Sequence, residues 1–298
     1  MAANIIDGVQ LAKAYREAIK ERVGAVRARG AKVRLDAILV EWGDNAARVY
    51  AENQARTCEM LGIDYKLHRL DHQSIFDDIA GRVLLLSSQD DVTAIMVHLP
   101  MPEGVDPYQV QRLIAPDKDV EGVNPANIGN VVYGRSSLAP CTGLAVLKML
   151  QNHYGIADVP GQRVDPFLRG KLAVVVGAGD VVGKPIAVLL MRQDATVVSC
   201  NKYTPEIREL TRQADILIAA AGVPGLIKAD MVKPGAVVID VGVNRVTGAD
   251  GKTRTVGDVD FESVKQVAGA ISPVPGGVGP MTVSMLLLNV VEAAEKHV

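Results

Sequence analysis

A glycine-rich stretch in the second half of the chain has the composition of a phosphate-binding loop. An apolar run over residues 172–176 leads directly into Gly177-Ala178-Gly179-Asp180-Val181-Val182-Gly183, and an apolar helical pattern follows. Glycines let the backbone approach a phosphate, and the N–H groups and dipole at the start of a helix favour an anion there. The spacing departs from the usual fingerprint by an extra residue, and a lone glycine pattern also serves ordinary turns. We interpret the stretch as a dinucleotide site formed by Gly177, Ala178, Gly179 and Val182.

The segment after the next expected strand bears on which dinucleotide binds. Sites for NAD commonly place an acid at the end of this strand, whereas sites for NADP supply positive charge or hydroxyl groups to the extra phosphate. Here residues 196–199 lead into Cys200-Asn201-Lys202-Tyr203-Thr204, which contains no carboxylate. Lys202 can pair with a phosphate. The sequence therefore favours NADP, with NAD as an open alternative because a loop lysine is often only solvated.

A second unusual stretch is Pro-Val-Pro-Gly-Gly-Val-Gly-Pro-Met-Thr at residues 273–282. Proline removes a backbone donor and glycine weakens regular structure, so the run predicts a shaped loop rather than a helix or a strand. Such a loop exposes backbone N–H and C=O groups without obstruction by side chains. It is therefore a candidate ligand-binding loop.

Further stretches fall in the order and approximate spacing of one known family. They are Val49-Tyr50, Leu61-Gly62-Ile63, Leu99-Pro100-Met101-Pro102, Pro116-Asp117-Lys118-Asp119-Val120, Pro140-Cys141-Thr142 and Asp240-Val241-Gly242-Val243-Asn244. Together with residues 273–282 they span nearly the whole chain, which closely resembles the methylenetetrahydrofolate dehydrogenase/cyclohydrolase family. The resemblance implies a tetrahydrofolate one-carbon derivative as substrate, a homodimer, and Val243 among the residues that bind the nicotinamide cofactor.

The resemblance also implies where the catalytic residues lie. The family has a tyrosine followed four residues later by a lysine, a glutamine before a Leu-Pro pair, and an aspartate after Lys-Asp-Val. The matching residues here are Tyr50, Gln54, His98 and Glu121, so only the tyrosine is retained. The same comparison implies that substrate contacts Tyr50, Gln54, Val97, His98, Leu99, Glu121, Pro275, Gly276 and Gly277.

These replacements bear differently on the two reactions of the family. Hydride transfer to a nicotinamide depends chiefly on positioning, whereas hydrolysis of the methenyl cation needs proton transfer. A glutamine amide cannot replace an acid/base lysine, so we expect a dehydrogenase with weak or absent cyclohydrolase activity. One alternative is a fully bifunctional enzyme in which His98 transfers the proton, although His98 is interpreted first as a polar residue that fills the cleft. Another is a non-catalytic folate- or nucleotide-binding relative.

The expected elements must position these residues. Alternating strands and helices predict an α/β protein with an N-terminal parallel-sheet domain and a Rossmann-type dinucleotide domain. The expected domains are 1–141, with a returning C-terminal helix at 282–298, and 142–281. Helices are expected at about 7–29, 46–61, 75–87, 142–154 and 283–296. Strands are expected at about 35–40, 64–70, 94–98, 171–176, 196–199, 216–220 and 236–240.

Composition places the chain among globular proteins. Of 298 residues, 48% are hydrophobic and 22% charged, which suits two domains with buried cores. A formal charge of -2 and 4% aromatic residues give no reason to expect nucleic acid or a membrane surface as partner. The first twenty residues lack the apolar core of a secretory signal, so we expect a cytoplasmic protein. His68 and His72 are interpreted as surface or strand-end residues rather than metal ligands.

Overall fold

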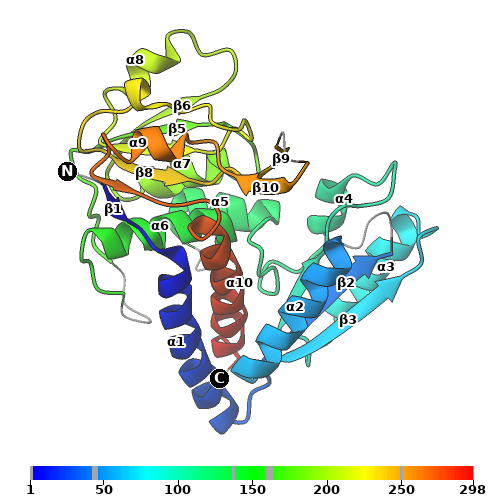
Figure 1. Cartoon of the computed structure of the whole chain (residues 1–298). Coiled ribbons are helices and arrows are strands. Elements are labelled where there is room, and N and C mark those ends of the chain that lie inside the picture. The colour runs from blue at the N-terminus through cyan, green and yellow to red at the C-terminus, as the bar shows by residue number, and fades with distance from the viewer. Residues whose placement is uncertain (1–2, 42–45, 136–137, 159–163, 249–250, 298) are drawn as a thin grey trace. The chain divides into compact units, whose positions relative to one another are not determined.

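The computed structural model describes residues 3–41, 46–135, 138–158, 164–248 and 251–297 (Figure 1). The chain forms two compact units, each discontinuous in sequence. The first unit comprises Met1–Ala12 and Thr142–Val283, and the second comprises Lys13–Cys141 and Ser284–Val298. Each unit contains a parallel sheet with helices, so the predicted α/β fold class is confirmed.

The first unit contains a six-stranded sheet in which every neighbouring pair is parallel. Its strand order is β1-β11-β8-β7-β5-β6. Because β5 lies between β6 and β7, the chain order reverses beside β5, and ligands of such sheets bind at the carboxyl ends of the strands there. The strands are β1 (Asn4–Ile5), β5 (Leu172–Val176), β6 (Thr196–Cys200), β7 (Ile216–Ala219), β8 (Val237–Asp240) and β11 (Ala270–Ile271).

Helices and a hairpin complete the first unit. Its core is aliphatic and centres on buried strand residues such as Val174, Leu217 and Val238, as expected for a sheet covered on both faces. The hairpin of β9 (Asn244–Thr247) and β10 (Thr253–Val256) is antiparallel. The remaining elements are α6 (Cys141–His153), α7 (Gly183–Met191), α8 (Ile207–Thr211), the short 3₁₀ helix η1 (Ala229–Met231) and α9 (Phe261–Val264).

The first residues of the chain belong to the first unit, and not to the N-terminal domain 1–141 that the sequence suggests. β1 pairs with β11, and the N–H of Ile6 donates to the carbonyl oxygen of Ile271 at 2.9 Å. A Cβ on Gly8 would lie 1.8 Å from the carbonyl oxygen of Gly277, so only glycine fits there. This grouping joins residues far apart in sequence, and local patterns could not indicate it.

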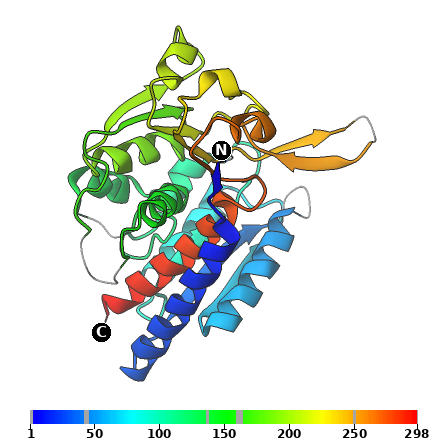
Figure 2. The same ribbon diagram turned by 60° about the vertical axis from the view of Figure 1, so that its left-hand side comes forward.

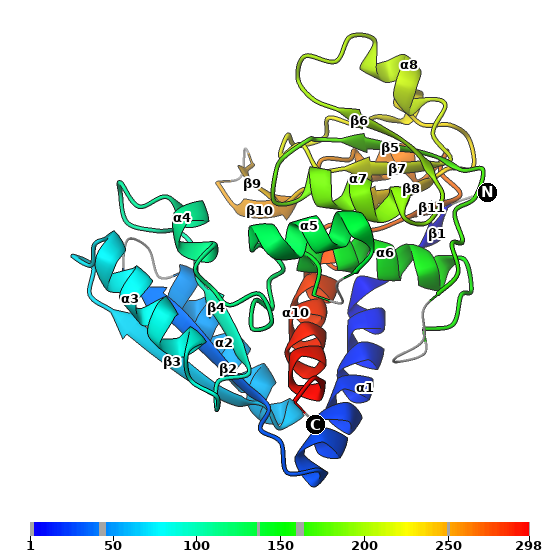
Figure 3. The same ribbon diagram turned by 180° about the vertical axis from the view of Figure 1, so that it is seen from behind.

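The second unit contains a three-stranded parallel sheet in the order β3-β2-β4. Helices α2 and α3 lie on opposite faces of this sheet (Figures 1 and 3). The segment after α4 continues beside β4, because the N–H of Ile95 donates to the carbonyl oxygen of Lys118 at 2.8 Å. The elements are β2 (Arg34–Val40), α2 (Ala46–Leu61), β3 (Asp64–Leu70), α3 (Phe76–Ser87), β4 (Ala94–Val97), α4 (Pro107–Gln111) and α5 (Pro125–Tyr133).

Helices α1 (Gly8–Ala28) and α10 (Val278–Glu295) each cross the division between the units. Asp7 caps α1, since its Oδ1 accepts from the N–H groups of Val9 and Gln10 at 2.9 and 3.0 Å. Within the second unit the two helices lie side by side (Figure 2), and Arg22 of α1 donates to both carboxylate oxygens of Glu295.

Helix α10 begins earlier than the sequence predicts. Residues 273–277 form the expected loop, but the helix starts at Val278 rather than about 283. Pro280 is accommodated because the N–H groups of a first helical turn need no intrahelical partner. By length and composition α10 could cross a membrane, but 67% of its apolar window is buried inside the protein, as in a core helix.

Candidate active site

Helix α2 carries Tyr50 and Gln54 one turn apart, so both side chains lie on one face of the helix. Tyr50 is 42% exposed, whereas Gln54 is only 3% exposed. Neither Nε2 nor Oε1 of the Gln54 amide has a hydrogen-bond partner among the described residues. Leaving buried polar atoms unpaired costs about 1–3 kcal/mol. The amide of Gln54 is therefore available to a ligand.

His98 follows β4 directly and faces the same helix. Its backbone N–H donates to the carbonyl oxygen of Ile38 at 2.8 Å, which fixes it at the carboxyl end of the strand. The Tyr50 ring meets the imidazole edge-on, with centroids 5.8 Å apart and planes at 80°. Burial lowers the pKa of His98 to about 4, so the ring is neutral at pH 7.

Tyr65 also contacts His98, and the sequence analysis did not identify it. Its hydroxyl oxygen lies 3.5 Å from Nε2 of His98, and burial raises the pKa of this phenol, so it stays protonated. The sequence did contain a signal for this contact. Successive side chains of β3 point to opposite faces of the sheet, which places Tyr65 on the face that α2 covers. The partner at the end of β4 lies 33 residues away in the chain and could not be read from sequence.

Glu121 approaches the same group of residues from the segment beside β4. The backbone N–H of Val97 donates to its Oε2 at 3.4 Å, a long contact. Burial, reinforced by Asp119, raises the pKa of this carboxyl to about 7. Burial also raises the pKa of Tyr50 to about 12, and the charge of Glu121 contributes to that shift.

Buried amides hold the segment that carries Glu121. Asp119 accepts at Oδ2 from the backbone N–H of Asn124 and from Nδ2 of Asn127, at 2.8 and 2.9 Å. From α10, Nδ2 of Asn289 donates to the carbonyl oxygens of Val120 and Ala139 at 2.8 and 3.1 Å. These bonds fix the backbone on both sides of Glu121.

The second unit thus brings together six of the expected residues. Val97 is buried and Leu99 is half exposed at the end of β4, and the peptide bond between Leu99 and Pro100 is cis. The other three expected substrate contacts belong to the first unit, in the loop between β11 and α10. There the bond preceding Pro275 is cis, Gly276 has a φ of +106°, and a Cβ on Gly277 would lie 2.5 Å from the carbonyl oxygen of Pro273.

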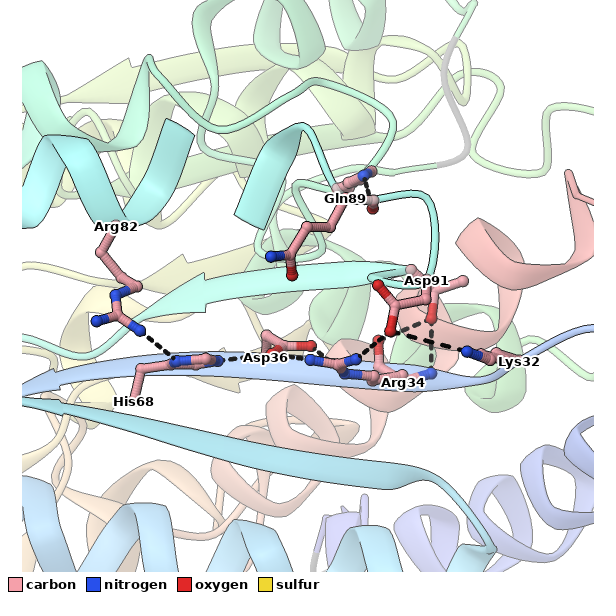
Figure 4. Close-up of polar contacts among 9 residues, drawn as sticks. Lys32, Arg34, Asp36, His68, Arg82, Gln89 and Asp91 are labelled. Carbon is pink, nitrogen blue, oxygen red and sulfur yellow. Dashed lines mark hydrogen bonds and ion pairs between the residues drawn. The ribbon is translucent and has the colours of Figure 1, made fainter. Parts of the chain in front are cut away.

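The opposite face of the small sheet carries a different polar cluster, the α3-face network of Arg34, Asp36, His68 and Arg82 (Figure 4). Oδ1 of Asp36 accepts hydrogen bonds from Nε2 of His68 at 2.6 Å and from a guanidinium nitrogen of Arg34 at 2.8 Å. Arg82 lies 3.1 Å from Nδ1 of His68. Since arginine only donates, Nδ1 accepts and Nε2 carries the proton given to Asp36. The interpretation of His68 as a surface residue is therefore wrong: it is buried and paired with a strand neighbour.

In the first unit, the glycine loop between β5 and α7 leaves no room for larger residues. A Cβ on Gly177 would lie 2.0 Å from the carbonyl oxygen of Ala220, and one on Gly183 would lie 1.7 Å from that of Gly177. Around Gly179 there is open space. Gly183 begins α7, so the positive end of the helix dipole lies beside this unobstructed backbone. The N–H of Lys184 already donates to the carbonyl oxygen of Gly179 at 3.0 Å, and Pro185 has no N–H. Ala178 and Val182 belong to the same turn, and this geometry fits a pyrophosphate.

The loop after β6 also fits an NADP site. Lys202 is exposed, and its Nζ lies 4.9 Å from the ring centroid of Tyr203, so its positive charge is accessible to a phosphate. Asn201 accepts from the N–H of Tyr203 at 2.9 Å, which shapes the turn. Val243, after β8, is 69% exposed.

Two buried aspartates, whose roles the sequence did not reveal, hold the loops that follow β7 and β8. Asp258 accepts at Oδ2 from the N–H groups of Ala221 and Gly222, at 2.6 and 2.8 Å. Asp240 accepts from the N–H groups of Gly242, Asp258 and Val259. Burial nevertheless raises the pKa of Asp240 to about 6.

Comparison with known families covers nearly the whole chain. The family model described as tetrahydrofolate dehydrogenase/cyclohydrolase, catalytic domain, matches residues 6–121. The model for the NAD(P)-binding domain of the same family matches residues 140–298.

Individual proteins are similar over their full length. The bifunctional protein FolD of Exiguobacterium sp. is 44% identical over 294 residues, which cover 99% of each chain. The crystal structure of the bifunctional enzyme FolD from Campylobacter jejuni is 37% identical, with a TM-score of 0.90 over 100% of both chains. The FolD of Trypanosoma brucei, complexed with NADP and an inhibitor, is 32% identical, with a TM-score of 0.88 over 100% of this chain and 99% of its own.

Proposed function

Because the chain belongs to the tetrahydrofolate dehydrogenase/cyclohydrolase family, we propose that it oxidises 5,10-methylenetetrahydrofolate with NADP. From the residue at position 54 we further propose that it hydrolyses the methenyl product slowly or not at all. The first part follows from full-length similarity to enzymes of this family: the chain is an NADP-dependent methylenetetrahydrofolate dehydrogenase. NADP, when bound, supplies the hydride acceptor. Gly177, Gly179 and the start of α7 would hold its pyrophosphate, and Lys202 its extra phosphate.

The dehydrogenase step makes modest chemical demands on this chain. It needs the folate held in place, and binding geometry alone can supply much of the rate. Tyr50, His98 and Glu121 surround one end of β4 and can orient a pterin and its one-carbon bridge. None of them has to gain or lose a proton for the hydride to leave the substrate carbon.

The single observation that carries the second part is the unpaired amide of Gln54. It occupies the position where the family resemblance implies a lysine, and it can donate or accept a hydrogen bond but cannot transfer a proton at neutral pH. General acid/base catalysis is typically worth about 10²–10⁴-fold in rate. Hydrolysis should slow by that order unless another group replaces the lysine.

A second candidate is an enzyme that performs both reactions. The relatives named above are called bifunctional, and this favours the alternative rather than the loss of the second step. In this chain the proton would then have to pass through His98 or Glu121. His98 is a weak base with a pKa of about 4, whereas the carboxyl of Glu121 titrates near neutrality.

One assay separates these candidates. The purified protein is mixed with methylenetetrahydrofolate and NADP, and reduced cofactor and methenyl product are followed separately. Under the proposal, methenyl product accumulates nearly mole for mole with NADPH. If added methenyltetrahydrofolate instead disappears rapidly in an enzyme-dependent reaction, the bifunctional candidate is correct, and His98→Gln then tests whether the imidazole is responsible.

Cofactor preference is assigned to Lys202 in this proposal. Lys202→Ala should raise the KM for NADP about tenfold and leave the KM for NAD nearly unchanged, because NAD has no phosphate to pair with the lysine. Equal losses for both cofactors would remove the basis for this assignment. The exposed Lys228, which lies outside the loop after β6, provides the matched control as Lys228→Ala.

The resemblance to the family also supports a homodimer. The N-terminal sequence supports a cytoplasmic location, and the low net charge supports the absence of nucleic acid or membrane as partner. Light scattering at micromolar concentration should give twice the mass of the 31.7 kDa chain. A monomeric mass would contradict the dimer, and recovery in a washed membrane fraction would contradict the location.

A further inference from the structure

In the part of the chain that the structure describes, the polar groups around the end of β4 are neutral or acidic. The Gln54 amide is uncharged, and the buried His98 imidazole is neutral at pH 7. The negative charge of Asp119 helps to raise the pKa of Glu121, and the negative charge of Glu121 helps to raise the pKa of Tyr50. A ligand that meets Gln54 and His98 therefore approaches two neutral groups and one ionisable acid.

The two folate forms in the dehydrogenase reaction differ in charge. Loss of a hydride from the methylene carbon leaves one positive charge, which is shared over the carbon and the two bridging nitrogens. We propose that this site is selective for the cationic methenyl form, with the neutral Gln54 beside the bridge and Glu121 as the counter-ion. This inference rests on the proposed function, because it assumes that the folate bridge binds next to Gln54.

Coulomb's law gives the size of the effect. At about 6 Å and an effective dielectric constant of about 20, two unit charges change an affinity by a factor on the order of a hundred. An ammonium group at position 54 would weaken the affinity for the methenyl cation by about this factor and would scarcely change the affinity for a neutral folate. The buried, unpaired amide removes that repulsion and still supplies a hydrogen bond.

Glu121 also links methenyl binding to the release of a proton. The groups that face its carboxyl are Asp119 in its own segment, Tyr50 from α2, Cys141 from α6 and the N–H of Val97 from β4. The pKa values of Tyr50 and Cys141 are raised, so both remain protonated. With its pKa near 7, Glu121 holds a proton below neutrality, and a cation must displace it. Affinity for the methenyl form should therefore rise with pH up to about 7 and then level off.

The test compares the affinities of the whole protein for two folates. The probes are 5,10-methenyltetrahydrofolate, which is cationic at the bridge, and 5-formyltetrahydrofolate, which is neutral there. Stopped-flow fluorescence between pH 5.5 and pH 8 measures both before the methenyl form hydrolyses. At pH 7 the wild type should bind the methenyl form about tenfold or more tightly, and Gln54→Lys should reduce this ratio at least about tenfold.

Two further variants show whether charge is the cause. Gln54→Met removes the amide without adding charge, so it should weaken both ligands alike and keep the ratio. Glu121→Gln should lower the ratio and abolish its dependence on pH, even if Gln54→Lys does not fold. Equal wild-type affinities, or a ratio that Gln54→Lys and Glu121→Gln leave unchanged, would overturn the inference.

The outcomes also separate this inference from the proposed function. A protein that oxidises methylenetetrahydrofolate but binds both probes equally retains the proposed function and loses the charge selectivity. A protein that binds neither probe and produces no NADPH loses the proposed function itself.

Discussion

The two faces of the sheet in the second unit treat polar side chains in opposite ways. On the α3 face, Asp36 receives contacts from Arg34 and His68, and Arg82 satisfies the far side of the imidazole. On the α2 face, the amide of Gln54 has no partner among the described residues, and Glu121 accepts from the backbone N–H of Val97 at 3.4 Å. Every side chain of the paired network has a partner within the network, and Nε of Arg34 lies 2.7 Å from the second carboxylate oxygen of Asp36. The other face is arranged for a molecule that brings donors and acceptors.

This difference separates two roles that look alike in a sequence. Buried charges that pair with one another hold strands together. Removing one partner leaves the others buried without a compensating charge, which lowers stability. Buried polar atoms without partners lower the stability of the free protein and mark where function has been favoured over stability. Substitutions on the two faces should therefore change stability in opposite directions.

The largest expected effect is on the paired face. Asp36→Ala should lower the free energy of unfolding by about 3–5 kcal/mol, because Arg34 and His68 lose a buried acceptor. Urea denaturation measures this loss. Dehydrogenase activity per folded molecule should change little, and a loss of less than about 1 kcal/mol would show that the network is not structural.

Glu121→Gln should have the next largest effect, and it should stabilise. An ordinary glutamate has a pKa near 4.3, and the folded value here is about 7. The native carboxyl thus holds its proton more tightly than the unfolded one, so the wild type loses stability as pH rises from about 4.3 to 7. The variant lacks this loss and should gain about 2 kcal/mol on the wild type by pH 7.5, allowing for the partial exposure of the side chain. Unfolding curves at pH 4.5 and pH 7.5 test the sign.

Gln54→Met should show a smaller gain in stability together with a loss of function. Replacing an unpaired buried amide by an apolar chain of similar length should raise the free energy of unfolding by about 1 kcal/mol. The kcat/KM for methylenetetrahydrofolate should fall about tenfold or more, since the ligand loses a hydrogen-bonding group. If the variant is instead less stable at full activity, the two faces do not differ as described.

The smallest effect is expected at the rim of the paired network. Asp91 lies 2.6 Å from a guanidinium nitrogen of Arg34, but its side chain is 44% exposed. Asp91→Asn should cost no more than about 1 kcal/mol, because exposed ion pairs contribute little. Screening by 1 M salt should abolish even that difference in the free energy of unfolding. A larger loss that persists in salt would show that Asp91 contributes to stability as the buried members of the network do.

Local patterns in the sequence predicted most regular elements. The helix at 46–61 and the strand at 64–70 agree with α2 and β3 at both ends, because capping glycines and apolar periodicity are local signals. The pairing of β1 with β11 was not predicted, since it joins residues more than 260 positions apart. The start of α10 was misplaced because proline tolerance depends on position within a helix, which composition does not reveal.

The candidate site shows the same limit. Tyr50, Gln54, His98 and Glu121 were located from the family resemblance, and the structure brings them together at one end of β4. The partners of His68 and the contact of Tyr65 with His98 were not foreseen, because they depend on strand register and on which helix covers which face. Whether a polar residue is paired or left open was not readable from the sequence at all.

The discontinuity of the units has a consequence for synthesis on the ribosome. The segment Lys13–Cys141 emerges early, yet its unit includes Ser284–Val298, and Asn289 supplies the amide that binds the carbonyl oxygens of Val120 and Ala139. About 150 further residues must be translated before that amide exists, which takes roughly 8–30 s at typical rates. The unit whose larger segment is encoded first is thus completed last, and the nascent segment around Glu121 is open to chaperones and proteases throughout that interval.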